Sequence, residues 1–327
     1  VRLGYDLFAR LVTLTNENGE HYRFEWDAAD RLQRQHNLDL SSKGYRYDAL
    51  GGLLEIDWQP IPGSQAPVLR HTYVRDAGSR LLSFTTDDGC TEYCYDGVDQ
   101  LLSVTFTDTQ GQSASVAFEY DGLGQRLAEI TDAGKLLHRY DELGNLIQTQ
   151  LPDGRTVNRL YYGSGHLHQV NVDGTVVCDF ERDRLHREVS RTQGRMSLTR
   201  EYDRCGRLRT QLRRNAQQPT HGPAPWQQRF VFDDLDNLVQ RYTQQPGKQH
   251  QVLLPHDASG RVMACQSALA GQNESFHYDP AANLTETPGV AVRHNQLQRY
   301  RDNRYRYDGF ARLLERRSSR YGFQTFT

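Results

Sequence analysis

The dipeptide Tyr-Asp recurs along the chain, and this repeat limits the possible folds more than any other feature of the sequence. Eight copies occur, whereas 18 tyrosines and 27 aspartates in 327 residues would form only about 1.5 such pairs by chance. Degenerate copies keep either the aspartate, as in Trp26-Asp27, or an aromatic residue, as in Phe180-Glu181, and the spacing is then roughly 20 to 30 residues. The residues that we expect to define the repeat structurally are Tyr5, Asp6, Trp26, Asp27, Tyr47, Asp48, Gly51, Tyr95, Asp96, Tyr120, Asp121, Gly124, Tyr140, Asp141, Gly144, Tyr202, Asp203, Gly206, Phe232, Asp233, Tyr278, Asp279, Tyr307 and Asp308.

Each copy has the pattern of a β-hairpin. A second aromatic residue often lies two positions upstream, as in Tyr45-x-Tyr47, so both rings lie on one face of a strand. A glycine often follows three residues after the aspartate, as in Asp121-Gly-Leu-Gly124, and this spacing favours a turn capped by the carboxylate. Dipeptides such as Asn18-Gly19 and Asp173-Gly174 mark a second set of turns between the repeats.

Together these signals predict an all-β fold, an antiparallel hairpin meander that forms a curved strip. We expect residues 1–327 to be one array of repeats, with surface loops near 59–67, 215–226 and 244–250. Hydrophobic residues make up 37% of the chain, which is below the usual level of about 45–50%. A one-layer wall with water on at least one side suits this composition, because it needs apolar residues mainly on one face of each strand.

The unit aromatic-x-Tyr-Asp-x-x-Gly-Arg/Asn-Leu resembles the YD repeat of the Rhs family. The match is clearest in 139–147, 201–208 and 306–317, and the segment 295–308 resembles the core of bacterial Rhs effectors exported by type VI secretion. This resemblance implies a strip that spirals into a hollow shell around a C-terminal toxin domain of the same parent protein. It also implies contacts with the remaining shell segments, a secretion spike protein and a dedicated chaperone. Such a protein is made in the bacterial cytoplasm and delivered into competing cells.

Two other functions share the repeat. Related YD proteins act as cell-surface adhesion or carbohydrate-binding arrays, and the alternating aromatic rings here could stack on sugars. YD repeats also build the cocoon of insecticidal toxin complexes. A regular aromatic ladder is more typical of packing along a sheet than of a sugar site.

Few residues suggest chemistry outside the repeat. Aspartates that recur with the repeat are typical of turn capping, not of a single active site. His166 and His168 would share one strand face, as would Cys90 and Cys94, but no spacing supplies the further ligands of a metal site. We therefore expect no metal and no cofactor, and we interpret the five cysteines as reduced thiols.

The charge pattern and known motifs also predict a non-enzymatic segment. A formal net charge of −2 gives no reason to expect nucleic-acid or membrane binding, and the arginine-rich stretches 182–191, 204–214 and 299–320 are interleaved with acidic residues. Common phosphate-loop, zinc-protease and serine-nucleophile motifs are missing. Asp279-Pro280 does not match the autoprotease segment that the Rhs resemblance implies. The first residues read as the middle of a longer chain, and we expect Tyr-Asp or a variant directly after Thr327.

Overall fold

The computed structural model describes residues 1–163, 165–215, 226–269, 271–287, 289–320 and 322–326. The strands in these ranges pair antiparallel, and the one helix assigned there is the short 3-10 helix η1 (Arg293–Asn295). The chain divides into two compact units. The first contains Val1–Ser115 and Phe276–Thr327, and the second contains Val116–Ser275. The predicted all-β antiparallel meander is confirmed.

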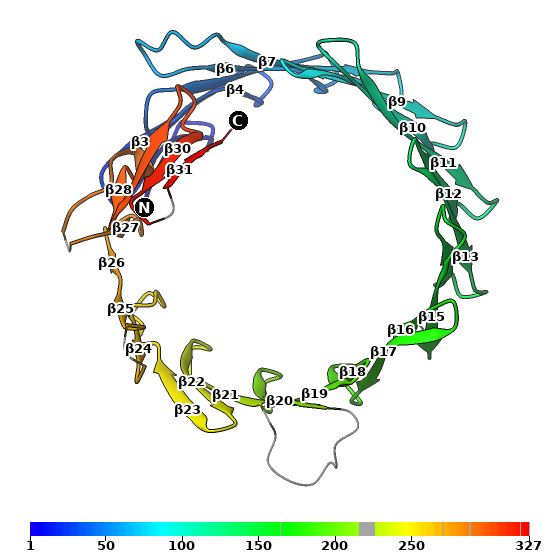
Figure 1. Cartoon of the computed structure of the whole chain (residues 1–327). Coiled ribbons are helices and arrows are strands. Elements are labelled where there is room, and N and C mark those ends of the chain that lie inside the picture. The colour runs from blue at the N-terminus through cyan, green and yellow to red at the C-terminus, as the bar shows by residue number, and fades with distance from the viewer. Residues whose placement is uncertain (164, 216–225, 270, 288, 321, 327) are drawn as a thin grey trace. The chain divides into compact units, whose positions relative to one another are not determined.

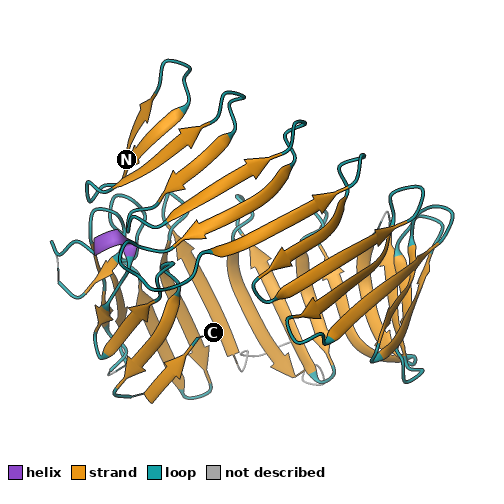
Figure 2. Cartoon of the chain, turned by 90° about the horizontal axis from the view of Figure 1, so that it is seen from above, coloured by secondary structure: helices purple, strands orange, loops and turns teal. Residues whose placement is uncertain are grey.

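In the first unit, ten strands follow one another in chain order, and each pairs with the next. Their hairpins run side by side in Figure 2. The strands are β1 (Arg2–Tyr5), β2 (Leu11–Thr15), β3 (His21–Trp26), β4 (Leu32–His36), β5 (Ser42–Tyr47), β6 (Leu53–Gln59), β7 (Leu69–Arg75), β8 (Leu81–Thr86), β9 (Gly89–Tyr95) and β10 (Leu101–Asp108).

In the second unit each strand likewise pairs with the next, and Figure 1 shows this unit as a curved strip one sheet thick. The strands are β11 (Ser113–Tyr120), β12 (Arg126–Thr131), β13 (Gly134–Tyr140), β14 (Leu146–Gln150), β15 (Thr156–Tyr162), β16 (His166–Val172), β17 (Thr175–Arg182), β18 (Glu188–Gln193), β19 (Met196–Tyr202), β20 (Leu208–Asn215), β21 (Trp226–Phe232), β22 (Leu238–Gln245), β23 (Lys248–Leu253), β24 (Ala264–Ser267) and β25 (Glu274–Ser275).

The C-terminal part of the first unit is less regular. A two-stranded sheet pairs β26 (His277–Tyr278) with β27 (Leu284–Thr285). After η1, a four-stranded sheet contains β28 (Arg299–Tyr300), β29 (Asn303–Tyr307), β30 (Leu313–Ser318) and β31 (Gly322–Thr325). This segment lies beside the first strands of the same unit, where red and blue ribbons meet in Figure 1.

Burial follows the strand period, as expected for a thin wall. In β3 the side chains of Tyr22, Phe24 and Trp26 are half-buried, whereas the intervening His21, Arg23 and Glu25 are exposed. Few apolar side chains are fully buried. Those in the described part of the chain are Leu38, Ala128, Cys178, Val252 and Val292. The strip is held mainly by backbone pairing and by contacts along one face.

The three predicted loops have different outcomes. Residues 60–68 form a loop between β6 and β7. The prediction for 244–250 is wrong, because β22 and β23 pair as far as Gln245 and Lys248 and leave only a two-residue turn. Gly247 makes this turn possible with φ +68°, whereas the Pro/Gly/Gln composition suggested a longer excursion. Most of the third loop, residues 216–225, lies outside the described residues.

Candidate functional site

The aspartate of each repeat begins a five-residue turn with one recurring hydrogen-bond pattern. In the turn Asp203–Arg207, the Asp203 N–H donates to the Arg207 carbonyl (2.9 Å), and the Gly206 N–H donates to the Asp203 carbonyl (3.1 Å). The Asp203 carboxylate oxygen Oδ1 accepts the N–H groups of Cys205 and Arg207, each at 2.9 Å. The same carboxylate bonds occur at Asp6, Asp27, Asp48, Asp76, Asp96, Asp121, Asp141, Asp183, Asp233, Asp257 and Asp308.

The fourth residue of the turn adopts positive φ. Gly51, Gly124 and Gly206 have φ between +81° and +90°, a region that glycine enters without steric cost. Other turns hold a non-glycine residue in the same conformation, at Ala9, Asp30, Ser79, Asp99, His186, Asp236, Ala282 and Ala311. The hydrogen bonds that the aspartate carboxylate accepts therefore hold the fourth residue in the left-handed region, even where that residue has a Cβ that disfavours this conformation.

The aromatic residue before the aspartate connects one hairpin to the previous one. It sits where the strand register shifts, for example between Glu201 and Tyr202. The Tyr202 hydroxyl donates to the Glu188 carbonyl (2.8 Å), which lies at the start of β18. Equivalent bonds to the backbone of a preceding strand or segment are made by Trp26, Tyr47, Tyr140, Tyr161 and Tyr307. Each of these side chains therefore donates a hydrogen bond to a backbone carbonyl near the end of a strand, where strand pairing stops.

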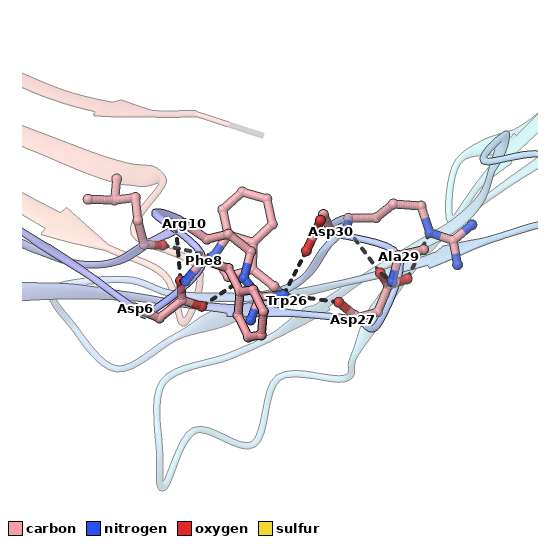
Figure 3. A network of polar contacts seen from close by, with 9 residues as sticks. Asp6, Phe8, Arg10, Trp26, Asp27, Ala29 and Asp30 are labelled. Atoms are coloured by element: carbon pink, nitrogen blue, oxygen red, sulfur yellow. Dashed lines mark hydrogen bonds and ion pairs between the residues drawn. The ribbon is translucent and has the colours of Figure 1, made fainter.

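The fifth turn residue is often arginine, and it bridges consecutive turns. Figure 3 shows Arg10, whose Nε donates to Asp6 Oδ2 at 2.7 Å. Its terminal nitrogen donates to the next turn, at the Asp27 carbonyl (3.3 Å) and at Asp30 Oδ1 (2.9 Å). We name this chain of contacts the Asp-Arg relay; it recurs from Arg31, Arg80 and Arg207 to the turn that follows each. Arg207, in the arginine-rich stretch 204–214, thus makes bonds from one turn to the next.

The side chain of the fifth turn residue also affects the ionisation of the turn aspartate. The side-chain hydrogen bond from Arg207 holds the pKa of Asp203 below its ordinary value, helped by backbone N–H donors and opposed by burial. The side-chain hydrogen bond from Asn145 lowers the pKa of Asp141 in the same way. Both carboxyls are therefore ionised acceptors at neutral pH, as turn caps and not as proton donors.

Two repeat units escaped the sequence analysis because arginine replaces tyrosine before the aspartate. The pairs are Arg75-Asp76 and Arg182-Asp183. The assignment of Phe180-Glu181 as a degenerate copy is wrong by two residues, because the turn begins at Asp183. Arg75 imitates the tyrosine, since its guanidinium donates to the Leu53 carbonyl. An aromatic residue two positions upstream and an arginine four positions after the aspartate could have identified both units.

The candidate metal ligands His166 and His168 have different partners. His166 stacks on His186 with ring centroids 3.7 Å apart, whereas His168 Nδ1 is 3.0 Å from the Phe180 carbonyl. Ser164, in the degenerate turn before His166, lies outside the described residues. Within the described ranges no three His, Cys, Asp or Glu side chains are grouped to hold a metal, and none of the five cysteines forms a disulfide.

A contact that sequence analysis did not predict joins Asp279 to the beginning of the chain. The Asp279 side chain is 1% exposed, and its Oδ2 accepts bonds from the Asn18 side chain (2.7 Å) and the Val292 N–H (2.8 Å). Burial acts to raise the pKa of Asp279, but the bonds from Val292, Asn283 and Asn18 outweigh it and hold the pKa below its ordinary value. The His294 N–H also donates to Glu20 (2.7 Å).

The repeated turn, the tyrosine bond and the relay are features of a repeat protein, and a family model of such a repeat matches this chain. The model of the teneurin YD-shell matches residues 62–326. The chain belongs to the teneurin YD-shell family. The expected resemblance to YD-repeat proteins is thereby confirmed.

Two curated relatives of this YD-shell chain are toxins. It is 31% identical to double-stranded DNA deaminase toxin A of Burkholderia cenocepacia, over 100% of this chain and 24% of that protein. It is also 31% identical to toxin protein Tse5 of Pseudomonas aeruginosa, over 80% of this chain and 18% of that protein. The chain therefore spans a quarter or less of the length of these relatives.

Solved structures show the same fold. The crystal structure of TcdB2-TccC3-Cdc42 matches with a TM-score of 0.68 and 14% identity, over 97% of this chain and 18% of that chain. A crystal structure of TcdB2-TccC3 matches with a TM-score of 0.66 and 13% identity over the whole chain. At this identity the likeness shows the fold alone. In addition, no helix in the described ranges is long and apolar enough to span a membrane.

Proposed function

We propose that this YD-shell chain is a wall segment of an Rhs-type shell that encloses a C-terminal toxin domain of the same parent protein. The observation that carries the proposal is the Asp-Arg relay, which adds turn-to-turn bonds to the backbone pairing within each strip. Both curated relatives bear toxin names, and the shell-like chain covers only 24% and 18% of them. That leaves most of each relative for further wall and for a toxin.

The mechanism of such a wall is confinement. A domain enclosed by backbone-paired strands cannot reach its target, so the producing cell is protected until delivery. The Tyr-Asp residues act structurally in this proposal: the aspartates cap the turns, and the tyrosines connect each hairpin to the previous one. The chain supplies no catalytic group, and the enzymatic activity belongs to the enclosed domain.

The proposal includes a delivery route and partners. The parent protein is made in the bacterial cytoplasm and passes into competing cells by type VI secretion, with a spike protein and a dedicated chaperone as partners. The toxin names of two bacterial relatives support a toxin role over the adhesion array. The segment itself binds neither nucleic acid nor membrane in this account.

The test is performed in producing cells that lack the immunity protein. Cells expressing the parent protein with an intact wall should grow, whereas cells expressing the double variant Asp203→Ala/Asp233→Ala should be poisoned as the wall opens. The same variant with an inactivated toxin is the control, and it should not affect growth. Equal toxicity with intact and opened walls would contradict confinement.

The fold match favours one alternative, the cocoon of an insecticidal toxin complex, because TcdB2-TccC3 has the same fold. Co-purification separates the two: a type VI spike protein supports our proposal, and a TcdB2-like partner supports the cocoon. Binding of the parent protein to a defined sugar through its aromatic face would instead support the adhesion array.

A further inference from the structure

Seven of the described turns that begin with the repeat aspartate carry a large, exposed apolar side chain at their third position, whereas other such turns have a small or polar residue there: Ala29, Gly78, Cys205 and Ser259. In the second unit these tips are Leu123, Leu143, Leu185 and Leu235, and their exposed fractions are 86, 72, 71 and 77%. Phe8, Leu50 and Val98 occupy the same position in the first unit and are 75, 88 and 74% exposed. A leucine this exposed contributes nothing to the fold of its own hairpin, and a row of them is typical of an interaction surface.

The tips of each unit lie along one edge of its strip. Each of these turns joins an odd-numbered strand to the next even-numbered strand, for example β11 to β12 and β19 to β20. Because consecutive strands are antiparallel, all such turns fall on the same edge, the YD edge. Turns of the same five-residue form on the opposite edge have polar third residues: Asn18, Asp39, Gln110 and Asp153. The two edges of the strip therefore differ in chemistry.

The first unit shows what a YD edge contacts. In the turn Asp308–Arg312, the Gly309 carbonyl accepts the Ile61 N–H at 2.8 Å, from the loop on the opposite edge of the strip. Its tip, Phe310, is only partly exposed and lines a cavity of about 320 Å³ together with Trp58 and His71.

The Asp279 turn makes a second contact of the same kind. Asp279 Oδ2 accepts from Asn18, which is the third residue of an opposite-edge turn. Both repeat turns of the C-terminal segment thus dock on the opposite edge of the strip formed by β1 to β7.

We propose that Leu123, Leu143, Leu185 and Leu235 form a docking surface for the opposite edge of a further YD-repeat strip, carried by the parent protein outside these residues. The contacts of Gly309, Phe310 and Asp279 are the precedent for this edge-to-edge packing. The length of the relatives, of which the chain covers 24% and 18%, provides room for such a strip. The inference depends on the proposed shell function in one respect only, namely that the parent protein contains a further strip.

Hydroxyl-radical footprinting of the full parent protein, with mass spectrometry of the oxidised leucines, tests the proposal. If the tips are covered, their oxidation should be on the order of five-fold lower than their exposure here implies, because packed interface cores exclude water. Leu160, a strand residue that is 49% exposed, is the internal control. Full oxidation of all four tips would overturn the proposal, and so would protection that disappears on dilution, because the occupant would then be a second copy.

A variant pair tests the energetic role of the tips. The change Leu143→Asp/Leu185→Asp should lower the thermal midpoint of the parent protein and expose both turns to protease, whereas Leu160→Asp should leave the turns protected. Containment is measured separately, by protease protection of the toxin domain in the wild-type protein. A contained toxin with exposed tips would refute the docking surface alone, and an exposed toxin with covered tips would refute confinement alone.

Discussion

At the scale of the residue, the fourth turn position shows how local conformation selects an amino acid. Gly124 has φ +81°. Gly122, in the same turn, has no left-handed φ, and no atom lies within 4 Å of the position that a Cβ would take there. The two glycines therefore differ in backbone conformation.

We predict that Gly124→Ala destabilises the β11–β12 hairpin by about 1 kcal/mol, because an L-residue is strained in the left-handed region. Gly122→Ala, the matched control, should cost close to nothing. Native-state hydrogen exchange of the β11 and β12 amides measures both, since a repeat array does not unfold as one unit. Equal effects of the two changes would rule out backbone strain as the cause.

The tyrosine hydroxyl supplies a second test at this scale. Tyr202→Phe removes the bond to the Glu188 carbonyl and should cost about 1 kcal/mol, the usual net value of such a bond. Faster hydrogen exchange should appear at the start of β18 and the end of β19. Tyr5→Phe, at a tyrosine that is 56% exposed, should change little by the same measurement.

At the scale of the element, the hydrogen-bonded turn carboxylates make the strip sensitive to acid. Hydrogen bonds hold the pKa of Asp203 and Asp141 below the ordinary value of 3.8. The stabilisation from such groups is fully present above the unfolded pKa and is lost as the pH falls through the lower folded pKa. Because the turn repeats, many carboxyls contribute over the same pH range.

We predict that the strip loosens as the pH falls below about 4, the range in which free aspartates protonate. Circular dichroism of the strand signal during acid titration measures this transition. In the variant Asp203→Asn/Asp141→Asn the strand signal should fall less steeply with pH than in the wild type, because two titrating groups are gone. An identical titration curve would show that the turn carboxyls do not determine acid stability.

At the scale of the whole molecule, the first unit depends on a contact between residues far apart in the chain. Asp279→Ala would leave the buried Val292 N–H without its acceptor, at a cost of about 1–3 kcal/mol. We predict that this change releases the segment after Phe276 and increases its cleavage by protease. Asp257→Ala, in a turn of the second unit, is the control and should leave that segment protected. Unchanged cleavage of the Asp279 variant would show that other contacts hold the segment.

Much of the fold was predictable because the repeat acts within a few residues. The five-residue turn, its aspartate cap and its left-handed fourth residue are local, so spacing alone located most of them. The copies at Arg75-Asp76 and Arg182-Asp183 were missed because arginine stands where the tyrosine is expected. The Arg75 guanidinium donates to the Leu53 carbonyl as a tyrosine would, whereas Arg182 donates to the His186 carbonyl of its own turn. Segment 244–250 was predicted as a loop because its Pro/Gly/Gln composition fits a loop and a tight turn equally well. One glycine is sufficient for the tight turn that forms there.

The amino-acid pattern alone therefore established an antiparallel YD-repeat meander, because each hairpin is specified by residues close together in the chain. The contacts of Asp279 with Asn18 and of Gly309 with Ile61 were decided only in three dimensions. These partners are separated by more than two hundred residues, and their polar side chains and backbone groups are common to many turns. Only the course of the folded chain selects which turn meets which edge, and so which apolar tips are covered.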